Sequence, residues 1–207
     1  MFKDNLVLTD EQMLDNITRF SELCERVGQH RVAGVKRMLD DMGDRIATAP
    51  ASSRREYHAA YPGGLVDHTL RVLVYALQLK KNVDIFSEIP TESVVFSALF
   101  HDIGKVGLPG KDGADYYVVE GDDWQRKRGK YYEVNRDVQK MQNVDNSMLI
   151  LLHYGINVTQ DEYLAIRLND GQYAEGNRQY AMHEPPLAIL IHMADRLACE
   201  AEKAIVR

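Results

Sequence analysis

The chain has 207 residues, of which 45% are hydrophobic and 27% are charged. These fractions are typical of a globular protein and exclude the disordered, collagen-like and low-complexity classes, and the length suits one domain. The 25 basic and 31 acidic residues give a formal net charge of −6, which disfavours a protein that holds long nucleic acid on a basic surface.

The sequence shows no membrane-spanning or targeting pattern. Its longest apolar runs, at 94–100, 148–152 and 187–191, are far shorter than the ~18 residues that a span needs. The first residues lack the basic and apolar regions of a signal peptide. The two cysteines, Cys24 and Cys199, lie far apart and form no CxxC pair, which disfavours a disulfide framework or a zinc ribbon. We therefore expect a cytoplasmic protein with no membrane partner.

Most of the chain is predicted to be helical. Thr9 and Gln12 have the spacing of a capping box, and the apolar residues that follow recur at helical intervals, so a helix is expected over 10–27. A second is expected to begin near Val32 and to stop around Gly43. A polar loop covers 48–55. Further helices are predicted at about 65–77, 91–102, 144–155, 159–169 and 186–207.

Residues 103–136 break this pattern. Glycines recur there, and two β-prone stretches, 116–119 and 131–134, flank a polar turn. We predict a long loop that carries a β-hairpin, and long loops in compact domains are usually functional or mobile. The predicted fold is all-α, a helical bundle with a small β-hairpin insertion. Residues 1–55 supply N-terminal helices, and 56–207 form the core of one single domain.

Four polar residues lie beside or within the apolar stripes of their predicted helices: His68, His101, Asp102 and Asp195. Buried carboxylates are costly unless they are paired or bind a cation. Two imidazoles and two carboxylates that converge would suit a divalent ion such as Mn²⁺, Fe²⁺, Ni²⁺, Zn²⁺ or Mg²⁺. Helical spacing alone also allows a hydrogen-bonded core histidine at His68 and an Asp195–Arg196 ion pair.

Four segments favour the metal interpretation: HAAYPGGLVDHTLRVL (58–73), ALFHDIGKVGLPG (98–110), LLHYG (151–155) and LAILIHMADRLACEAEK (187–203). In this order they resemble the HD-domain phosphohydrolases, whose H…HD…D pattern is met by the four residues above. The resemblance is closest to the HD domain of 3′–5′ exoribonuclease-type proteins. It implies an all-α HD-domain bundle and a metal-dependent phosphohydrolase whose metal ligands are His68, His101, Asp102 and Asp195.

The resemblance also suggests roles for further residues. Lys105, after the HD pair, would act with Asp102 in catalysis by offsetting phosphoryl charge. His153 lies near the position of a further histidine of binuclear members, so a second ion through Asp102 and His153 is open beside one firmly held ion. His192 is expected behind the ligands or in the core. Candidates for substrate binding are His58, Arg71, Trp124 and Asp170.

The function predicted from the sequence is hydrolysis of a phosphoester of a nucleotide or short oligonucleotide by metal-activated water. The partner would be a phosphorylated small molecule or short nucleic acid, and homo-oligomer formation stays open. Three alternatives remain. The chain could be a dNTP or dNMP nucleotidohydrolase, a 3′–5′ exoribonuclease, or a metal-bound nucleotide sensor without turnover.

Overall fold

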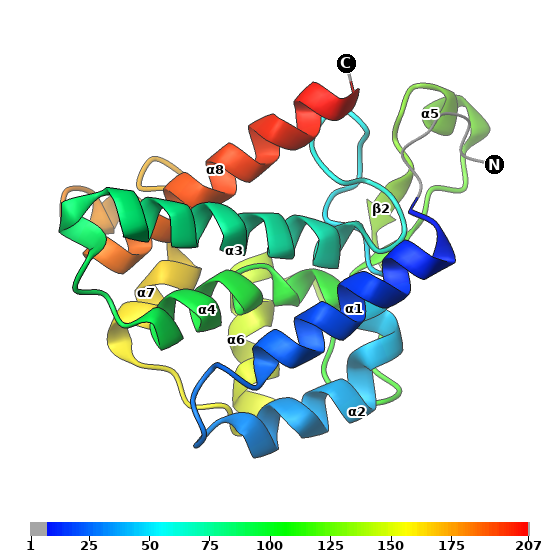
Figure 1. Cartoon of the computed structure of the whole chain (residues 1–207). Coiled ribbons are helices and arrows are strands. Elements are labelled where there is room, and N and C mark those ends of the chain that lie inside the picture. The colour runs from blue at the N-terminus through cyan, green and yellow to red at the C-terminus, as the bar shows by residue number, and fades with distance from the viewer. Residues whose placement is uncertain (1–7, 207) are drawn as a thin grey trace.

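The fold is organised around α3 (Gly64–Asn82), which lies among four other helices in the computed structural model. The structure describes residues 8–206. In Figure 1, α8 (Pro186–Val206) runs along one side of α3 and α4 (Thr91–Phe100) along the other. Because neighbours cover most of its surface, α3 is apolar over a wide arc, and its first half is almost entirely buried.

Two N-terminal helices pack against this centre. α1 (Asp10–Cys24) begins at the expected capping box, in which Thr9 and Gln12 bond each other's backbone. α2 (Val32–Thr48) runs five residues beyond the expected stop at Gly43. A glycine inside a helix lowers the stability of that helix by only about 1 kcal/mol. The apolar stripe of α2 continues past Gly43 to Ile46, which is fully buried. Packing of the last turn therefore outweighs the local preference to stop.

The insertion contains the expected hairpin and one helix that the sequence did not predict. β1 (Tyr117–Val119) pairs with β2 (Tyr132–Val134) in an antiparallel ladder, with Tyr117 opposite Val134. Between them lies α5 (Asp123–Lys127), capped by the side chain of Asp122. Five residues are too few for an apolar period to be recognised. A 3₁₀-helix, η2 (Ile103–Val106), leads into the insertion.

The insertion is fixed to the loop that precedes α3. The backbone N–H of Arg55 donates to Gly129 O at 2.8 Å, and that of Tyr131 donates to Ser53 O at 2.9 Å. The guanidinium of Arg45, near the end of α2, donates to the carbonyls of Leu108 and Ala114. The hairpin and the loop that carries His58 are thus joined by backbone hydrogen bonds.

The C-terminal part adds three α-helices, of which α7 and α8 pack on α3 or α4. α6 (Asn143–His153) packs on η2, and α7 (Gln160–Arg167) packs on α4 and α8. α8 begins at Pro186, as expected. The second expected capping box, Thr159 with Glu162, opens α7. Two short 3₁₀-helices complete the order, η1 (Asp84–Phe86) and η3 (Arg178–Tyr180). The predicted all-α fold with a small hairpin insertion is confirmed.

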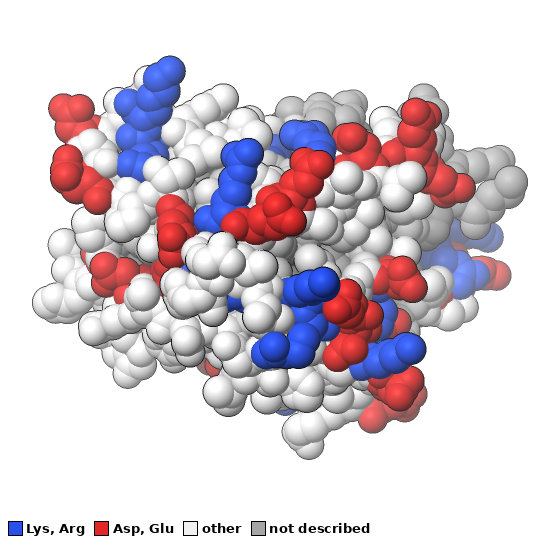
Figure 2. All heavy atoms as spheres, turned by 60° about the horizontal axis from the view of Figure 1, so that its bottom comes forward, with Lys and Arg blue, Asp and Glu red and all other residues white. Residues whose placement is uncertain are grey.

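The surface carries charges of both signs. On the face drawn in Figure 2, Lys and Arg side chains alternate with Asp and Glu side chains and form no continuous basic field. Such a mixed face gives no broad attraction for a nucleic-acid backbone. Within residues 8–206, each helix is too short or too polar to cross a lipid bilayer.

Candidate metal centre

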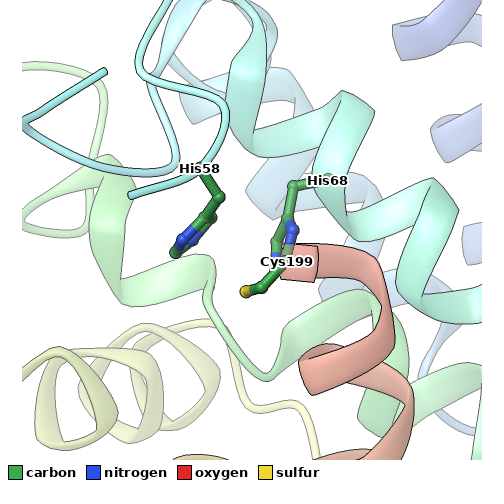
Figure 3. Close-up of side chains that lie close together, drawn as sticks. All are labelled: His58, His68 and Cys199. Atoms are coloured by element: carbon green, nitrogen blue, oxygen red, sulfur yellow. The ribbon is translucent and has the colours of Figure 1, made fainter. Parts of the chain in front are cut away.

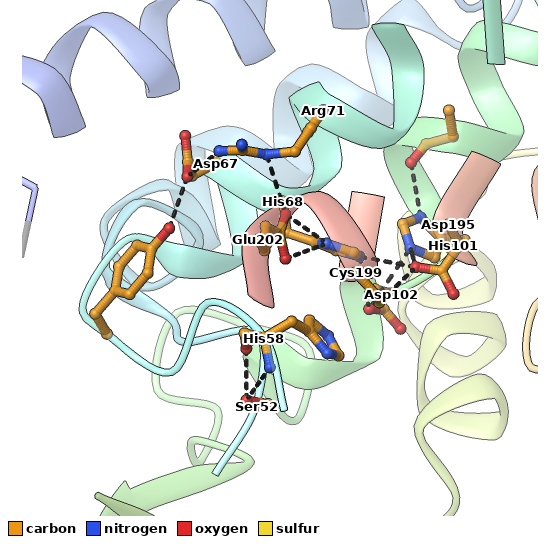
Figure 4. Close-up of polar contacts among 12 residues, drawn as sticks. Ser52, His58, Asp67, His68, Arg71, His101, Asp102, Asp195, Cys199 and Glu202 are labelled. Carbon is orange, nitrogen blue, oxygen red and sulfur yellow. Dashed lines mark hydrogen bonds and ion pairs between the residues drawn. The ribbon is translucent and has the colours of Figure 1, made fainter. Parts of the chain in front are cut away.

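The site lies between α3 and α8, where His68 points toward the neighbouring helix (Figure 3). His101 and Asp102 reach it from the end of α4, and Asp195 reaches it from α8 (Figure 4). His68 Nε2 lies 3.0 Å from Asp195 Oδ1 and 3.9 Å from Asp102 Oδ2. His101 Nε2 lies 3.5 Å from Asp102 Oδ2 and 3.9 Å from Asp195 Oδ1. The structure therefore brings together the four residues that the sequence singled out.

The end of α4 explains how two consecutive residues face one site. His101 still has helical backbone angles, whereas Asp102 has φ −114° and ψ 8°, so the backbone turns between them. The following η2 lies tightly against α6, since a Cβ at Gly104 would stand 2.1 Å from Asn143 O. This close approach requires glycine. It also lets the Asn143 amide donate to Asp102 Oδ1 at 2.6 Å and fix that carboxylate.

Hydrogen bonds on the far side of each imidazole settle its tautomer. His101 Nδ1 lies 2.8 Å from the carbonyl of Ala98, and His68 Nδ1 lies 3.0 Å from Glu202 Oε1. A carbonyl and a carboxylate only accept, so each Nδ1 carries the hydrogen. In each neutral ring, Nε2 then carries a lone pair and no hydrogen. Both Nε2 atoms are buried and make no hydrogen bond.

This arrangement fits a divalent cation. With the rings neutral and the acids ionised, two nitrogen lone pairs and two carboxylate oxygens face one another, and no hydrogen lies between them. Such an arrangement is unfavourable unless a positive charge lies among these atoms. Imidazole and carboxylate together are ligands of first-row divalent metals. The bond from His68 Nδ1 to Glu202 is the support that metal-binding histidines usually have. His68, His101, Asp102 and Asp195 would hold the ion.

The pKa values of these groups describe the metal-free state. Burial by itself would lower the pKa of His68, but the carboxylates of Asp195 and Glu202 outweigh it and raise the pKa to about 10. Burial opposes ionisation of Asp195, yet the His68 ring, whose Nε2 lies 3.0 Å from Oδ1, lowers the pKa of Asp195 to about 2. Lys105 and the histidines likewise hold the pKa of Asp102 below its usual range despite burial. Without a metal, a proton on His68 takes the place of the cation.

A cavity of about 370 Å³ opens onto this centre. Asp102 and Asp195 line it, and so do Lys105, His58 and Asp170, three of the other expected site residues. Lys105 Nζ is 2.5 Å from Asp102 Oδ2, and that contact raises the lysine pKa against the effect of burial. Burial, followed by repulsion from Lys105, lowers the pKa of His58 to about 3, so its ring is neutral.

Apart from the four ligands of the centre, three expected site residues do not line this cavity: Arg71, Trp124 and His153. Arg71 Nη2 donates to Asp67 Oδ2 at 3.0 Å, and its Nε lies 3.2 Å from Glu202 Oε1, so the guanidinium supports Glu202. The ring of Trp124 is 57% exposed on α5 and lies under the Arg128 guanidinium. The structure thus places Arg71 and Trp124, both expected to bind substrate, outside the cavity.

His153 is also placed away from the centre. α6 meets Asp102 through Asn143 at its first residue, whereas His153 is its last residue and is exposed. Ten residues of helix span about 15 Å. The second metal position expected through Asp102 and His153 therefore has no support in the geometry.

The sequence reasoning missed Glu202 and Asn143, which hold His68 and Asp102 from behind. Glu202 follows Asp195 by seven residues, or two helical turns. Its position on the same face of α8 could therefore have been predicted from the spacing. Nothing in the local sequence marks Asn143. His192 was expected behind the ligands; it lines the cavity, and its Nδ1 lies 2.7 Å from Asn169 O. Arg196 pairs with Glu200, not with Asp195.

Comparison with known proteins agrees with this geometry. The model of the HD domain matches residues 65–199, a range that contains all four expected ligands. The match does not single out the exoribonuclease type. Neither the curated proteins nor the solved structures gave a match to the chain. The chain belongs to the HD-domain family, a superfamily of metal-dependent phosphohydrolases.

Proposed function

We propose that the protein hydrolyses a phosphoester bond of a nucleotide or a short oligonucleotide. The observation that carries the proposal is the set of two imidazole lone pairs and two carboxylates at one end of a cavity that is large enough for a small ligand. Cavities that bind small molecules usually have volumes of ~300–1,000 Å³.

A bound divalent ion would polarise a phosphoryl oxygen and lower the pKa of a water molecule. The residues of the chain have separate tasks. Glu202 and the Ala98 carbonyl orient the two imidazoles, and Asn143 orients Asp102. The Lys105 ammonium faces the cavity beside Asp102, where it can stabilise negative charge that develops on a phosphoryl oxygen.

A second cavity supports a substrate with groups on both sides of the phosphorus atom. It has a volume of about 260 Å³, and it shares Lys105 and Tyr117 with the first cavity. Tyr132 and Pro50 also line it. Aromatic and proline side chains offer flat apolar surfaces on which a base can stack. A phosphodiester held at Lys105 would place one group in each cavity, which favours a short oligonucleotide over a simple monoester.

The test is hydrolysis by the Mn²⁺-loaded full-length protein. Nucleoside monophosphates, nucleoside triphosphates, dinucleotides, cyclic dinucleotides and a longer single-stranded RNA should be compared at equal concentration. We expect hydrolysis of the dinucleotides, loss of turnover in His101→Ala and no change in His153→Ala. Stepwise shortening of the RNA with no action on small substrates would establish an exoribonuclease. Binding of nucleotides without turnover would establish a sensor. Either result would refute the proposal.

A further inference from the structure

A second group of metal-binding atoms lies beside the HD centre. It consists of His58 from the loop before α3, His68 from α3 and Cys199 from α8, and Figure 3 shows their side chains close together. One ligand atom of each residue lies within 4.8 Å of the others. The rings of His58 and His68 have centroids 4.7 Å apart.

His58 and Cys199 are not engaged elsewhere in a way that would prevent binding. His58 Nε2 is buried and has no hydrogen-bond partner. The backbone of His58 is held by Ser52, whose hydroxyl donates to His58 O at 2.5 Å, so the ring is presented from a fixed loop. The thiol of Cys199 donates a hydrogen bond of 3.6 Å to Asp195 Oδ1, and this bond is given up when the thiol loses its proton to bind an ion. Both side chains line the cavity, which gives an ion access to them.

The ligand types favour a thiophilic ion. Two nitrogens and one sulfur form a set that binds Zn²⁺, and the HD centre offers two nitrogens with carboxylate oxygens, which suit harder ions. Metal–nitrogen and metal–sulfur bonds of ~2.0–2.3 Å at tetrahedral angles place two ligand atoms of one ion about 3.3–3.8 Å apart. The three atoms, which lie within 4.8 Å of one another, must therefore approach one another by up to about 1.5 Å when an ion binds.

The two groups compete for one atom. Because His68 Nδ1 is bonded to Glu202, Nε2 is the nitrogen that His68 can offer to either ion. We propose that His58, His68 and Cys199 form a separate site for a thiophilic divalent ion such as Zn²⁺, and that an ion bound there withdraws His68 from the HD centre. On binding, the thiol proton leaves to solvent and the sulfur donates its electron pair, without a redox change.

The binding claim stands without the proposed function, whereas the inhibition that it implies rests on that function. The direct test is titration of the metal-free full-length protein with Co²⁺, because cobalt bound to thiolate gives a charge-transfer absorption in the near ultraviolet. We expect the band in the native protein and in Cys24→Ala, which removes the other cysteine of the chain. The band should be lost in Cys199→Ala and weakened in His58→Gln, with helical circular dichroism unchanged.

The outcomes separate the two proposals. Absence of the band in native protein that has bound Co²⁺, or its persistence in Cys199→Ala, would overturn the second site. Zn²⁺ added to the Mn²⁺-loaded protein should suppress turnover of the native protein and of Cys24→Ala, and it should suppress turnover of Cys199→Ala less. Equal suppression in all three would show that Zn²⁺ does not act through Cys199. If no preparation shows turnover, the proposed function fails and the cobalt band still decides the site.

Discussion

His68 and Glu202, which are 134 residues apart in the chain, are joined by a buried hydrogen bond of 3.0 Å from Nδ1 to Oε1. Arg71 Nε lies 3.2 Å from the same oxygen and helps to hold the carboxylate in place. This bond fixes the imidazole tautomer and turns Nε2 toward Asp102 and Asp195. A carboxylate behind a histidine ligand also makes the imidazole a stronger donor to a metal.

Replacement of Glu202 by glutamine should weaken metal binding. The Glu202→Gln side chain keeps the shape but loses the charge that supports His68, and loss of such support typically costs 10–100-fold in metal affinity. The dissociation constant for Mn²⁺, measured by calorimetry, should rise by about that factor. Glu200→Gln, an exposed change on the same helix, should leave it unchanged. Equal affinities in both variants would contradict the role of Glu202.

Metal removal should destabilise the protein, because its ligands come from α3, from the end of α4 and from α8. An ion present at a hundred times its dissociation constant stabilises the folded state by about 2.7 kcal/mol. Chelation should therefore lower the melting temperature of the native protein and of His153→Ala. In His101→Ala the melting temperature should not respond to chelator. If neither metal nor chelator changed the melting temperature of the native protein, the metal centre would be excluded.

Metal binding should depend on pH through His68. Its pKa in the metal-free protein is about 10, so an ion must displace one proton at neutral pH. Apparent affinity should fall by about tenfold for each unit of decreasing pH below 10. Binding should also release close to one proton per ion, which a pH indicator in weak buffer can count.

The same proton affects the stability of the metal-free protein. Because folding raises the pKa of His68 from 6.5 to about 10, the contribution of His68 is complete below pH 6.5 and is lost as pH rises toward 10. Denaturant unfolding of the metal-free protein across this range measures that loss. A pH-independent metal affinity together with flat stability would show that His68 is neutral before metal binds.

Lys105 should affect turnover more than binding. If its ammonium stabilises charge that appears only in the transition state, Lys105→Ala should reduce kcat by roughly 10²-fold or more, as does removal of one preorganised donor in other enzymes. Lys111→Ala is a matched control, because this lysine is exposed in the same insertion. A change in KM alone would make Lys105 a binding residue.

Tyr117 of the hairpin, and not Trp124, should contact the substrate. Tyr117 lines both cavities, whereas Trp124 is exposed on α5. Tyr117→Ala should raise KM by about tenfold if the ring stacks on a base, since one stacking contact contributes ~1–3 kcal/mol. Trp124→Ala should have no effect. The reverse result would show that the hairpin closes over the substrate in a different position.

The sequence by itself determined most of the helices and the inward positions of the four polar residues at the centre. Local signals were sufficient for the capping boxes at Thr9 and Thr159, because such hydrogen bonds join residues three apart. Helical phase placed His68 and Asp195 on inward faces, and the order of the motifs joined them with His101 and Asp102. These properties depend on residues that are near one another in the chain.

Tertiary structure alone decided which inward-facing groups meet. Helical phase tells on which side of its helix a residue lies. It does not tell at which point along their lengths two helices touch. α6 docks at Asp102 through Asn143, so His153 at its other end is excluded from the centre. Arg71 shares the helix of His68, yet Glu202 of α8 draws its guanidinium away from the cavity. The site is therefore defined by contacts between residues that are distant in the chain, 41 positions apart for Asp102 and Asn143 and 134 positions apart for His68 and Glu202, and local sequence patterns do not encode those contacts.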